Sequence, residues 1–324
     1  MKKWYLIVYA LAVMATISAN AASSDASRHV TFEDKQIPVI KRTDVLLVGS
    51  SLDACFLAST FAKEGQRVVL AAAGTSLPHE LIMCQRPWVK RSWLDSSDVK
   101  IKAFLSGCVD REVGDDSLLD MIKVTEGLED LLLDSGASLH YDLFPCGVAQ
   151  TDRVVTAVVF ACKGGLVAVE ADTVIDCTAD ALIVTLAGGE TKARASAQNG
   201  VLARYSYLCK EERSAPIAVK DVPELVNGQV VMHGPYAEFR LRLPVPESSF
   251  PEAVYNQDAR RIVMRASRGT DLQYARGGNT MLMDPARRIV SRSKTGTLTL
   301  DACRPEKLDN VWVCGPMVDV EDEL

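Results

Sequence analysis

The sequence lacks the short motifs that mark several common classes of enzyme and metalloprotein. It contains no Cys-x-x-Cys pair and no Gly-x-Ser-x-Gly elbow, and the missing elbow argues against a serine hydrolase. Zinc usually needs clustered cysteine and histidine ligands. The four histidines instead lie singly, at His29, His79, His140 and His233. We therefore expect no metal site.

An excess of positive charge is also missing. The 324 residues carry a formal net charge of −6, whereas a nucleic-acid-binding scaffold is usually basic. No internal repeat or low-complexity segment interrupts the chain, and 48% of its residues are hydrophobic. A chain of this length and composition predicts one large globular domain or two intertwined ones, with no nucleic-acid partner.

Long apolar runs are absent except at the N-terminus. Lys2 and Lys3 precede the apolar run from Trp4 to Ile17, and small residues follow it up to Ala21. This order is typical of a secretory signal peptide, so we expect residues 1–21 to be removed and the protein to be exported, either periplasmic or extracellular. The alternative is an uncleaved anchor, for which the run is short. After cleavage, we expect no stable membrane span.

The nine cysteines do not form a recognisable disulfide framework. Their number is odd, and several lie within apolar strand-like runs, as Cys177 and Cys314 do. We expect most of them to be buried free thiols that act as small hydrophobic residues.

A strand–helix–strand unit is predicted near the start of the mature chain. Residues 22–42 are polar and are interpreted as a leader. Residues 43–49 form a short apolar run that suits a buried parallel strand, and residues 52–65 have small and apolar residues at helical spacing. Residues 66–74 are again strand-like. The pattern is that of a βαβ unit and indicates an α/β fold with a central parallel sheet.

The rest of the chain predicts further elements of such a fold. Residues 115–137 have the pattern of an amphipathic helix or helix pair, capped by Asp115 or Asp116 and ended by Gly136. Residues 153–180 predict a hairpin that turns at 163–165, and its last strand, 173–177, is apolar enough to return to the central sheet.

The turn after the first strand resembles the dinucleotide-binding fingerprint G-x-G-x-x-G/A, in which the middle glycine lets the backbone approach a pyrophosphate. Gly49 and Ala54 occupy the first and third positions, but Ser51 replaces the middle glycine. The acidic residue that would bind ribose hydroxyls is also missing, because Ala72 stands near its place. The fingerprint supports a Rossmann-type unit more strongly than it supports cofactor binding.

Several segments in the right order resemble the FAD-dependent oxidoreductases. The run "ADTVIDCTADALIVTLAGG" is similar to the family's strand and turn A-x-x-V-I-D-A-T-G-D with its following helix. The run "DPARRIVSRSKTGTLTLDACRPEKLDNVWVCGPMVDV" is similar to a late segment in which Arg-Arg-Ile precedes a strand. The resemblance covers roughly residues 43–190 and 250–320. It implies an FAD/NAD(P)-binding domain with a β-hairpin or meander insertion, formed by residues 43–202 and 286–324, and a mixed substrate-side domain at 203–285.

The resemblance also implies a set of residues near FAD. The first motif would hold the pyrophosphate, Val148 would lie near the adenine, and the paired Arg287 and Arg288 would face the flavin or an anionic substrate, or else form a surface or interdomain ion pair. In the family's Thr-Gly-Asp turn, alanine here replaces glycine. The implied cofactor-binding residues are Gly49, Ser50, Ser51, Ala54, Ala72, Val148, Thr178, Ala179, Asp180, Arg288 and Gly315.

The chain departs from the family at its end, where a helix usually follows the late glycine. It stops at Val320–Leu324, so we expect a truncated or split member. Cys84 lies where the class often places residues near the flavin, with Arg86 two residues away, although a lone cysteine is more often inert. No catalytic set is recognisable.

Three interpretations remain open. The first is an FAD-dependent oxidoreductase that acts on an unidentified small organic substrate. The second is a non-catalytic scaffold that has lost tight flavin binding and acts as a binding or interaction protein, as the departures at Ser51, Ala72 and Ala179 suggest. The third is an NAD(P)-dependent enzyme, which would need the same turn and the same ribose-binding acidic residue that is absent near Ala72.

Overall fold

The computed structural model describes residues 29–194, 200–244, 251–268, 270–277, 282–285, 287–293 and 297–318. The expected signal peptide and the chain end at Val320–Leu324 lie outside these residues. The described chain forms two compact units. One, here called the antiparallel unit, contains Pro78–Thr125 and Ala193–Ala286. The other, called the parallel-sheet unit, contains residues 29–77, Glu126–Lys192 and the chain from Arg287 onward.

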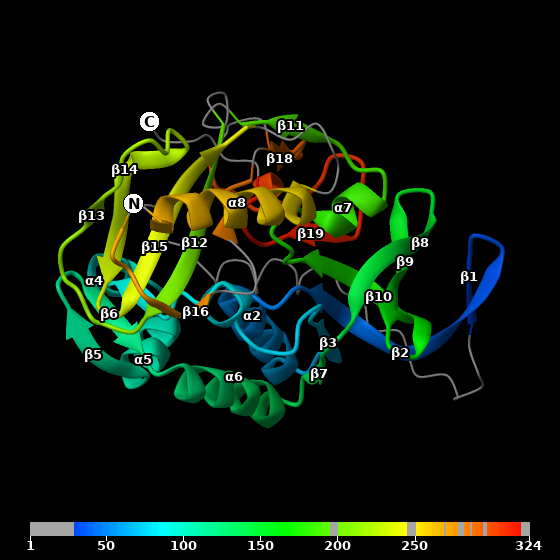
Figure 1. Ribbon diagram of the computed structural model, residues 1–324. Coiled ribbons are helices and arrows are strands. Elements are labelled where there is room, and N and C mark those ends of the chain that lie inside the picture. Colours follow the sequence, from blue (N-terminus) through cyan, green and yellow to red (C-terminus); the bar gives the residue numbers. More distant parts are fainter. Residues whose placement is uncertain are drawn as a thin grey trace. The chain divides into compact units, whose positions relative to one another are not determined.

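The parallel-sheet unit contains an eight-stranded sheet with helices beside it (Figure 1). Its strands are β1 (His29–Phe32), β2 (Lys35–Val48), β3 (Val68–Ala71), β7 (Ser138–His140), β8 (Phe144–Thr151), β9 (Val154–Cys162), β10 (Gly165–Asp176) and β19 (Val311–Val313). Its helices are α2 (Leu52–Lys63), α6 (Met121–Ser135, which begins in the antiparallel unit) and α7 (Leu182–Leu186). A two-stranded sheet, β11 (Thr191–Ala193) with β18 (Arg287–Ile289), and the 3-10 helix η2 (Asp301–Cys303) complete it.

The strand order is β7-β3-β2-β10-β9-β8, with β19 pairing the end of β10. The pairs β7–β3, β3–β2, β2–β10 and β10–β19 are parallel, so β2, β3, β10 and β19 end at the same edge. The residues from Val45 to Val48 are at most 1% exposed. Burial on both faces is what a continuous apolar strand in a parallel sheet requires. The predicted βαβ unit is confirmed as β2–α2–β3.

The antiparallel unit contains two sheets and one long helix. Its larger sheet has the order β13-β14-β15-β12-β16, with β17 on β12, and its smaller sheet has the order β4-β6-β5. The strands are β4 (Trp88–Lys90), β5 (Val109–Val113), β6 (Asp116–Leu119), β12 (Val201–Cys209), β13 (Ile217–Ala218), β14 (Leu225–His233), β15 (Tyr236–Leu243), β16 (Tyr274–Gly277) and β17 (Leu282–Met283). The helices are α3 (His79–Ile82), α4 (Arg91–Ser96), α5 (Val99–Gly107) and α8 (Pro251–Arg268).

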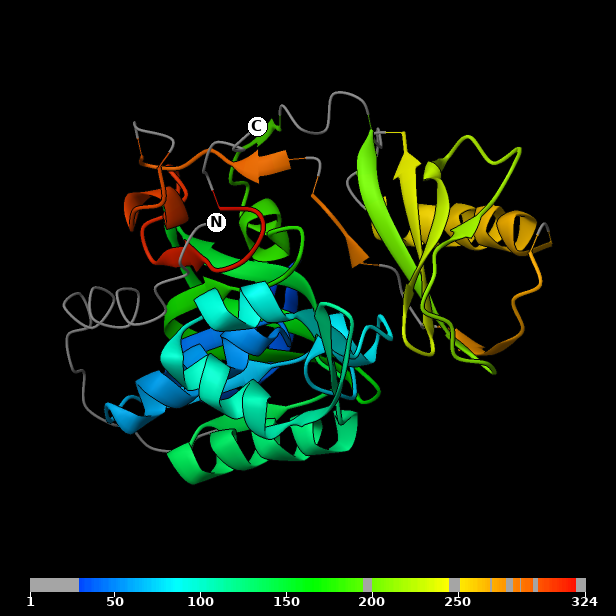
Figure 2. The same cartoon turned by 90° about the vertical axis from the view of Figure 1, so that its left-hand side faces the viewer.

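Helix α8 lies across strands β12 and β15 of the larger sheet (Figures 1 and 2). Ala237, Phe239 and Leu241 alternate along β15 and are fully buried in a core that includes Ala259 and Val263 of α8. Because side chains alternate across a strand, Tyr236, Glu238 and Arg240 project from the opposite face of β15. One face of the larger sheet is therefore covered by α8 and the core, and the other face carries polar and charged side chains.

Two predicted boundaries differ from the structure. The expected leader at 22–42 includes β1 and the first half of β2, which pair as an antiparallel hairpin. The expected helix at 115–137 was wrong in its first part, because Asp116–Leu119 form β6 between β4 and β5. The helix is capped by Asp120, whose carboxylate accepts hydrogen bonds from the N–H groups of Ile122 and Lys123, rather than by Asp115 or Asp116.

The other elements predicted for the parallel-sheet unit are confirmed. The hairpin β9–β10 turns at residues 163–164, and the end of β10 returns to the sheet beside β2. No helix among the described residues is long and apolar enough to cross a membrane.

Candidate functional site

The turn at Gly49 brings three strands close together at one edge of the parallel sheet. Gly49 follows β2 with a φ of +134°, a conformation that side chains rarely adopt. A Cβ atom at this position would lie 2.5 Å from the carbonyl oxygen of Cys177, which follows β10. The Gly49 N–H donates to the Ala71 carbonyl oxygen at the end of β3. Glycine is therefore required for the chain to pass from β2 into α2.

The residues after Gly49 form the first turn of α2. Ser51 is the N-cap of this helix, and its hydroxyl accepts a hydrogen bond of 3.2 Å from the Ala54 N–H. Ser50 is 8% exposed, and Ala54 is fully buried, as the close packing of helix and strand in the fingerprint requires. Ser51, which replaces the middle glycine of the fingerprint, thus caps helix α2.

The structure offers no ribose ligand at Ala72. This residue is fully buried, its N–H donates to the His140 carbonyl oxygen, and its own carbonyl accepts from the Leu143 N–H. Both main-chain groups are therefore engaged, and the side chain has no polar atom.

The turn after β10 is built around a buried carboxylate. Asp176 is 0% exposed and accepts hydrogen bonds from the Thr178 N–H at 3.0 Å, the Thr178 hydroxyl at 2.6 Å and the Val184 N–H at 3.1 Å. Burial raises its pKa to about 6, although these hydrogen bonds lower it. Ala179 in this turn is exposed and Asp180 is half-buried. Asp176 thereby fixes the turn that the resemblance places against the cofactor.

The late glycine lies at the same edge. Gly315 follows β19 with a φ of +148°, and a Cβ atom there would lie 3.8 Å from the Thr178 carbonyl oxygen. The structure therefore brings together Gly49, Thr178 and Gly315, at the carboxyl ends of three neighbouring strands. In open α/β sheets, this edge is where ligands bind.

The remaining expected residues lie on other elements, and the strand of Arg287 and Arg288 is joined to the segment after Gly315 by a hydrogen bond of 2.9 Å from the Ile289 N–H to the Met317 carbonyl oxygen. Val148 is paired with Val158 in β8, which β9 separates from β10. Arg287 is exposed and donates two hydrogen bonds of 2.7 Å to Thr191, so it joins β18 to β11. Arg288 is half-buried in the same strand. Cys84, in the antiparallel unit, is fully buried.

One carboxylate near the α2 turn was not singled out from the sequence. Asp53, which is half-buried, follows the N-cap by two residues, and partial loss of solvent raises its pKa to about 6. An unfolded aspartate has a pKa of about 3.9, so the folded state binds the proton more tightly. The stability contribution of this group is complete below about pH 4 and is lost as the pH rises through about 6.

We expect Asp53→Asn to remove this pH dependence. Between pH 4 and pH 7, the variant's free energy of unfolding should rise relative to that of the wild type by about 2 kcal/mol. Urea unfolding at both pH values measures this difference. A difference between wild type and variant that is the same at both pH values would contradict the assigned role.

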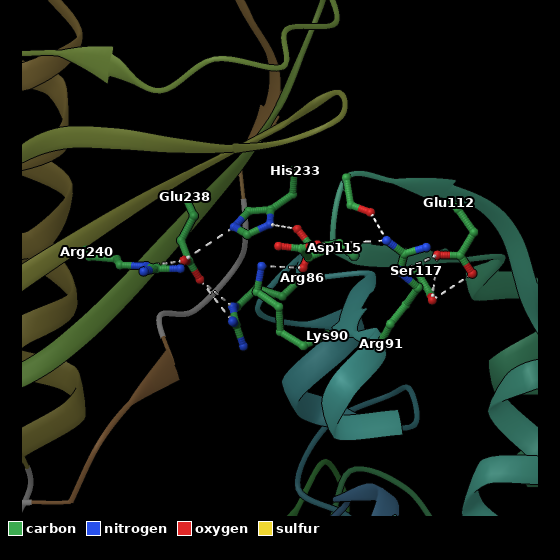
Figure 3. Close-up of polar contacts among 11 residues, drawn as sticks. Arg86, Lys90, Arg91, Glu112, Asp115, Ser117, His233, Glu238 and Arg240 are labelled. Atoms are coloured by element: carbon green, nitrogen blue, oxygen red, sulfur yellow. Dashed lines mark hydrogen bonds and ion pairs between the residues drawn. The ribbon is translucent and has the colours of Figure 1, made fainter. Parts of the chain in front are cut away.

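A second group of charged residues lies in the antiparallel unit and joins its two sheets (Figure 3). His233 at the end of β14 is 1% exposed, and its Nδ1 lies 2.6 Å from Asp116 Oδ2 in β6. Its Nε2 lies 3.5 Å from Glu238 Oε2 in β15. Both ring nitrogens therefore face carboxylates, although the Nε2 atom makes no hydrogen bond to the described residues. Trp88 stacks on this ring with a centroid distance of 4.2 Å.

Glu238 is the centre of this cluster. It is fully buried, and its Oε1 accepts from Arg86 Nε at 3.0 Å, while its Oε2 accepts from Arg240 Nε at 2.5 Å. Burial alone would raise its pKa, but the contact with His233 and the charges of Arg86 and Arg240 outweigh burial and hold the pKa well below its usual range. Lys90 pairs with the other oxygen of Asp116 at 2.8 Å.

Sequence reasoning missed this cluster, because its members are far apart in the chain. Arg86 and Glu238 are separated by 152 positions. The run "AEFRLRL" offered a partial signal, since its charged residues alternate with apolar ones as on a two-faced strand. No group of three or more histidine, cysteine or acidic residues in the described part of the chain is arranged to hold a metal ion.

Comparison with known proteins points to one family. A family model described as "FAD dependent oxidoreductase" matches residues 44–242. No curated protein sequence matches the chain.

Solved structures share the fold at low identity. OxyS anhydrotetracycline hydroxylase from Streptomyces rimosus has a TM-score of 0.55 and 13% identity, over 86% of this chain and 56% of that one. A geranylgeranyl bacteriochlorophyll reductase-like protein from Thermoplasma acidophilum has a TM-score of 0.53 and 14% identity, over 86% and 72%. The p-nitrophenol 4-monooxygenase PnpA from Pseudomonas putida has a TM-score of 0.53 and 11% identity, over 87% and 74%. This chain thus spans little more than half of the first protein. The expected α/β, Rossmann-like fold is confirmed.

Proposed function

The chain belongs to the FAD dependent oxidoreductase family, and we propose that it binds FAD at the carboxyl edge of its parallel sheet to oxidise or reduce a small organic molecule. FAD is the cofactor of this family, and when bound it supplies the electron transfer. The observation that carries the proposal is the meeting of Gly49, Thr178 and Gly315 at that edge.

The residues at this edge fit the pyrophosphate end of the cofactor. The positive φ of Gly49 lets the chain turn directly into α2, and the N-terminus of this helix offers N–H groups and a positive dipole end to an anion. Gly315 adds a second position without a side chain, opposite the Thr178 carbonyl. The main chain of Gly49, Ser50 and Ser51 would hold the phosphates, and Asp176 keeps the Thr178 turn in place.

The ribose end fits less well, and this favours a second candidate function. Ala72 provides neither a carboxylate nor an unengaged main-chain group, and Ser51 uses its hydroxyl to cap α2. A non-catalytic scaffold that binds flavin weakly or not at all would have these features. Flavin binding distinguishes the two functions.

Substitutions at Ser51 test the pyrophosphate pose. We expect Ser51→Gly to tighten FAD binding about tenfold, because the Cβ atom at the middle glycine position crowds the phosphates. The variant should lose only a few tenths of a kcal/mol of stability, since glycine is a tolerable N-cap. Fluorescence titration with FAD measures the dissociation constant.

The control is Ser51→Ala, which removes the hydroxyl and keeps the Cβ atom. It should cost about 1 kcal/mol of stability and leave FAD affinity no better than in the wild type. Equal affinities of the glycine variant and the wild type would count against the pose. Improved binding by the alanine variant would show that the hydroxyl, rather than the Cβ atom, is the obstacle.

We also propose that the protein is exported and then cleaved after Ala21, on the strength of the N-terminal Lys-Lys pair, the apolar run and the small residues that follow. N-terminal sequencing of the protein recovered from a periplasmic or culture fraction should begin at Ala22. An intact N-terminus on protein that stays with the membrane would support the uncleaved anchor instead.

The substrate is proposed here only as a small organic molecule. The solved structures named above are described as a hydroxylase, a reductase-like protein and a monooxygenase, so their reactions on organic molecules are compatible with the proposal. The shared fold by itself does not select among such reactions.

A further inference from the structure

The face of β15 that lies opposite α8 presents two arginines held by one carboxylate. Arg86 uses Nε and Nη2 on Glu238 Oε1, at 3.0 and 2.9 Å, and Arg240 uses Nε on Oε2 at 2.5 Å. The outer nitrogens of Arg240 and the Nη1 of Arg86 make no hydrogen bond or ion pair with the described residues, and the Arg86 guanidinium lies over the Trp88 ring at 5.1 Å from its centroid. The side chain of Arg240 is 37% exposed and that of Arg86 is 18% exposed, whereas Glu238 is buried. Both guanidinium groups are therefore fixed on one side and retain N–H donors on the other.

The charge of the cluster favours an anion. Glu238 and Asp116 contribute two negative charges, which Arg86, Arg240 and Lys90 exceed by one even when His233 is neutral. The two ion pairs of Glu238 are also prearranged, because His233 lies beside Glu238, and Trp88 stacks on His233 and lies under the Arg86 guanidinium. A ligand would meet oriented donors rather than mobile side chains, which lowers the entropy cost of binding.

A buried hydroxyl on the same face is a second, independent observation. Ser206 lies opposite Glu238 in the register of β12 and β15, and the pleat places both side chains on the same face. Ser206 is 0% exposed, and its Oγ has no hydrogen-bond partner among the described residues. A buried polar atom without a partner is costly, so a ligand atom that supplies one is favoured.

We propose that Arg86 and Arg240, with Ser206 beside them, form a subsite for a carboxylate group, and that the substrate of this protein is an organic carboxylic acid. This inference rests on the proposed function, since it describes the substrate of the same enzyme. A guanidinium group presents planar, paired N–H donors that match the two oxygens of a carboxylate. Glu238 is a positioning residue in this site, because it acts through the two arginines and is buried away from the ligand.

Calorimetric titration of the full-length protein with benzoate tests the subsite, with benzamide as the neutral molecule of the same shape. We expect saturable binding of benzoate and no measurable binding of benzamide. Arg240→Gln and, separately, Arg86→Gln should each weaken benzoate binding at least tenfold, as the loss of a charge-assisted hydrogen bond predicts. Ser206→Ala should weaken it a few-fold.

Arg261→Gln is the matched control. This arginine lies on α8, which packs against the other face of the sheet, and its side chain is 81% exposed in a local pair with Asp258. Its removal also deletes one positive charge and should leave benzoate affinity unchanged. Two arginine variants are tested so that a folding defect in one, seen as a loss of cooperative thermal unfolding, does not decide the result.

Several results would overturn the subsite: no benzoate binding, equal binding of benzamide, or the same loss of affinity in Arg261→Gln as in the Arg86 and Arg240 variants. The flavin absorbance of each sample is recorded separately. Protein that holds FAD but does not bind benzoate contradicts the subsite and leaves the proposed function standing. Colourless protein that binds benzoate through Arg86 and Arg240 supports the carboxylate site and contradicts the proposed function.

Discussion

Gly49→Ala is expected to destabilise the protein by about 3 kcal/mol or more and to abolish retention of FAD. The new Cβ atom would lie 2.5 Å from the Cys177 carbonyl oxygen, and the φ of +134° is itself unfavourable for alanine. To relieve the contact, β2 and β10 must separate at the edge where we propose the cofactor binds. Urea unfolding and flavin absorbance after gel filtration measure the two effects.

Gly65→Ala provides the matched control for this prediction. Gly65 follows α2, also has a positive φ, of +87°, and has no heavy atom within 4 Å of an added Cβ. It should therefore show only the conformational cost of about 1 kcal/mol and should keep the flavin. If the two variants behave alike, the close approach of β2 and β10 is not what makes Gly49 necessary.

Glu238→Gln is expected to lower the free energy of unfolding at pH 7 by about 3 kcal/mol, because it leaves Arg86 and Arg240 without their buried counter-charge. The control is Asp258→Asn, which breaks a solvent-exposed pair with Arg261 and should change stability by less than about 0.5 kcal/mol. Urea unfolding of the three proteins tests the prediction. A Glu238 variant as stable as the wild type would mean that the cluster is not a structural element.

The same substitution has an expected pH dependence. The pKa of Glu238 is held below its usual range, so its contribution is complete above the unfolded pKa of about 4.3 and is lost as the pH falls toward the folded pKa. The stability difference between wild type and Glu238→Gln should therefore be constant from pH 5 to pH 7 and shrink below about pH 4. A difference that grows on acidification would reverse the assigned sign.

The parts of the fold that follow from local pattern could be predicted from the sequence. The β2–α2–β3 unit, the β9–β10 hairpin and the return of β10 to the sheet follow from apolar runs, glycine turns and helical spacing. Residues 116–119 are predicted as helical because the spacing of apolar residues in "DSLLDM" is compatible with a helix as well as with a strand. Only their pairing with β4 and β5 makes them a strand. Such short apolar runs cannot be assigned from periodicity alone.

The residues of the candidate sites also differ in whether the sequence alone could predict them. Gly49 and Ala54 were recognisable because a fingerprint joins neighbouring residues, and Thr178 and Gly315 because the segments around them resemble those of the FAD-dependent oxidoreductases. The members of the Glu238 cluster come from β6, β14, β15 and the segment before β4, so their meeting depends on the tertiary fold. The capping role of Ser51 and the engaged main chain of Ala72 likewise became visible only with the hydrogen bonds in place.

The most direct test of the proposed FAD site is the visible absorption spectrum of the purified protein after incubation with excess FAD and gel filtration. Circular dichroism on the same sample establishes that the chain is folded. We expect flavin absorbance at close to one FAD per folded chain. A folded, colourless protein would contradict the proposed FAD site and favour the non-catalytic scaffold.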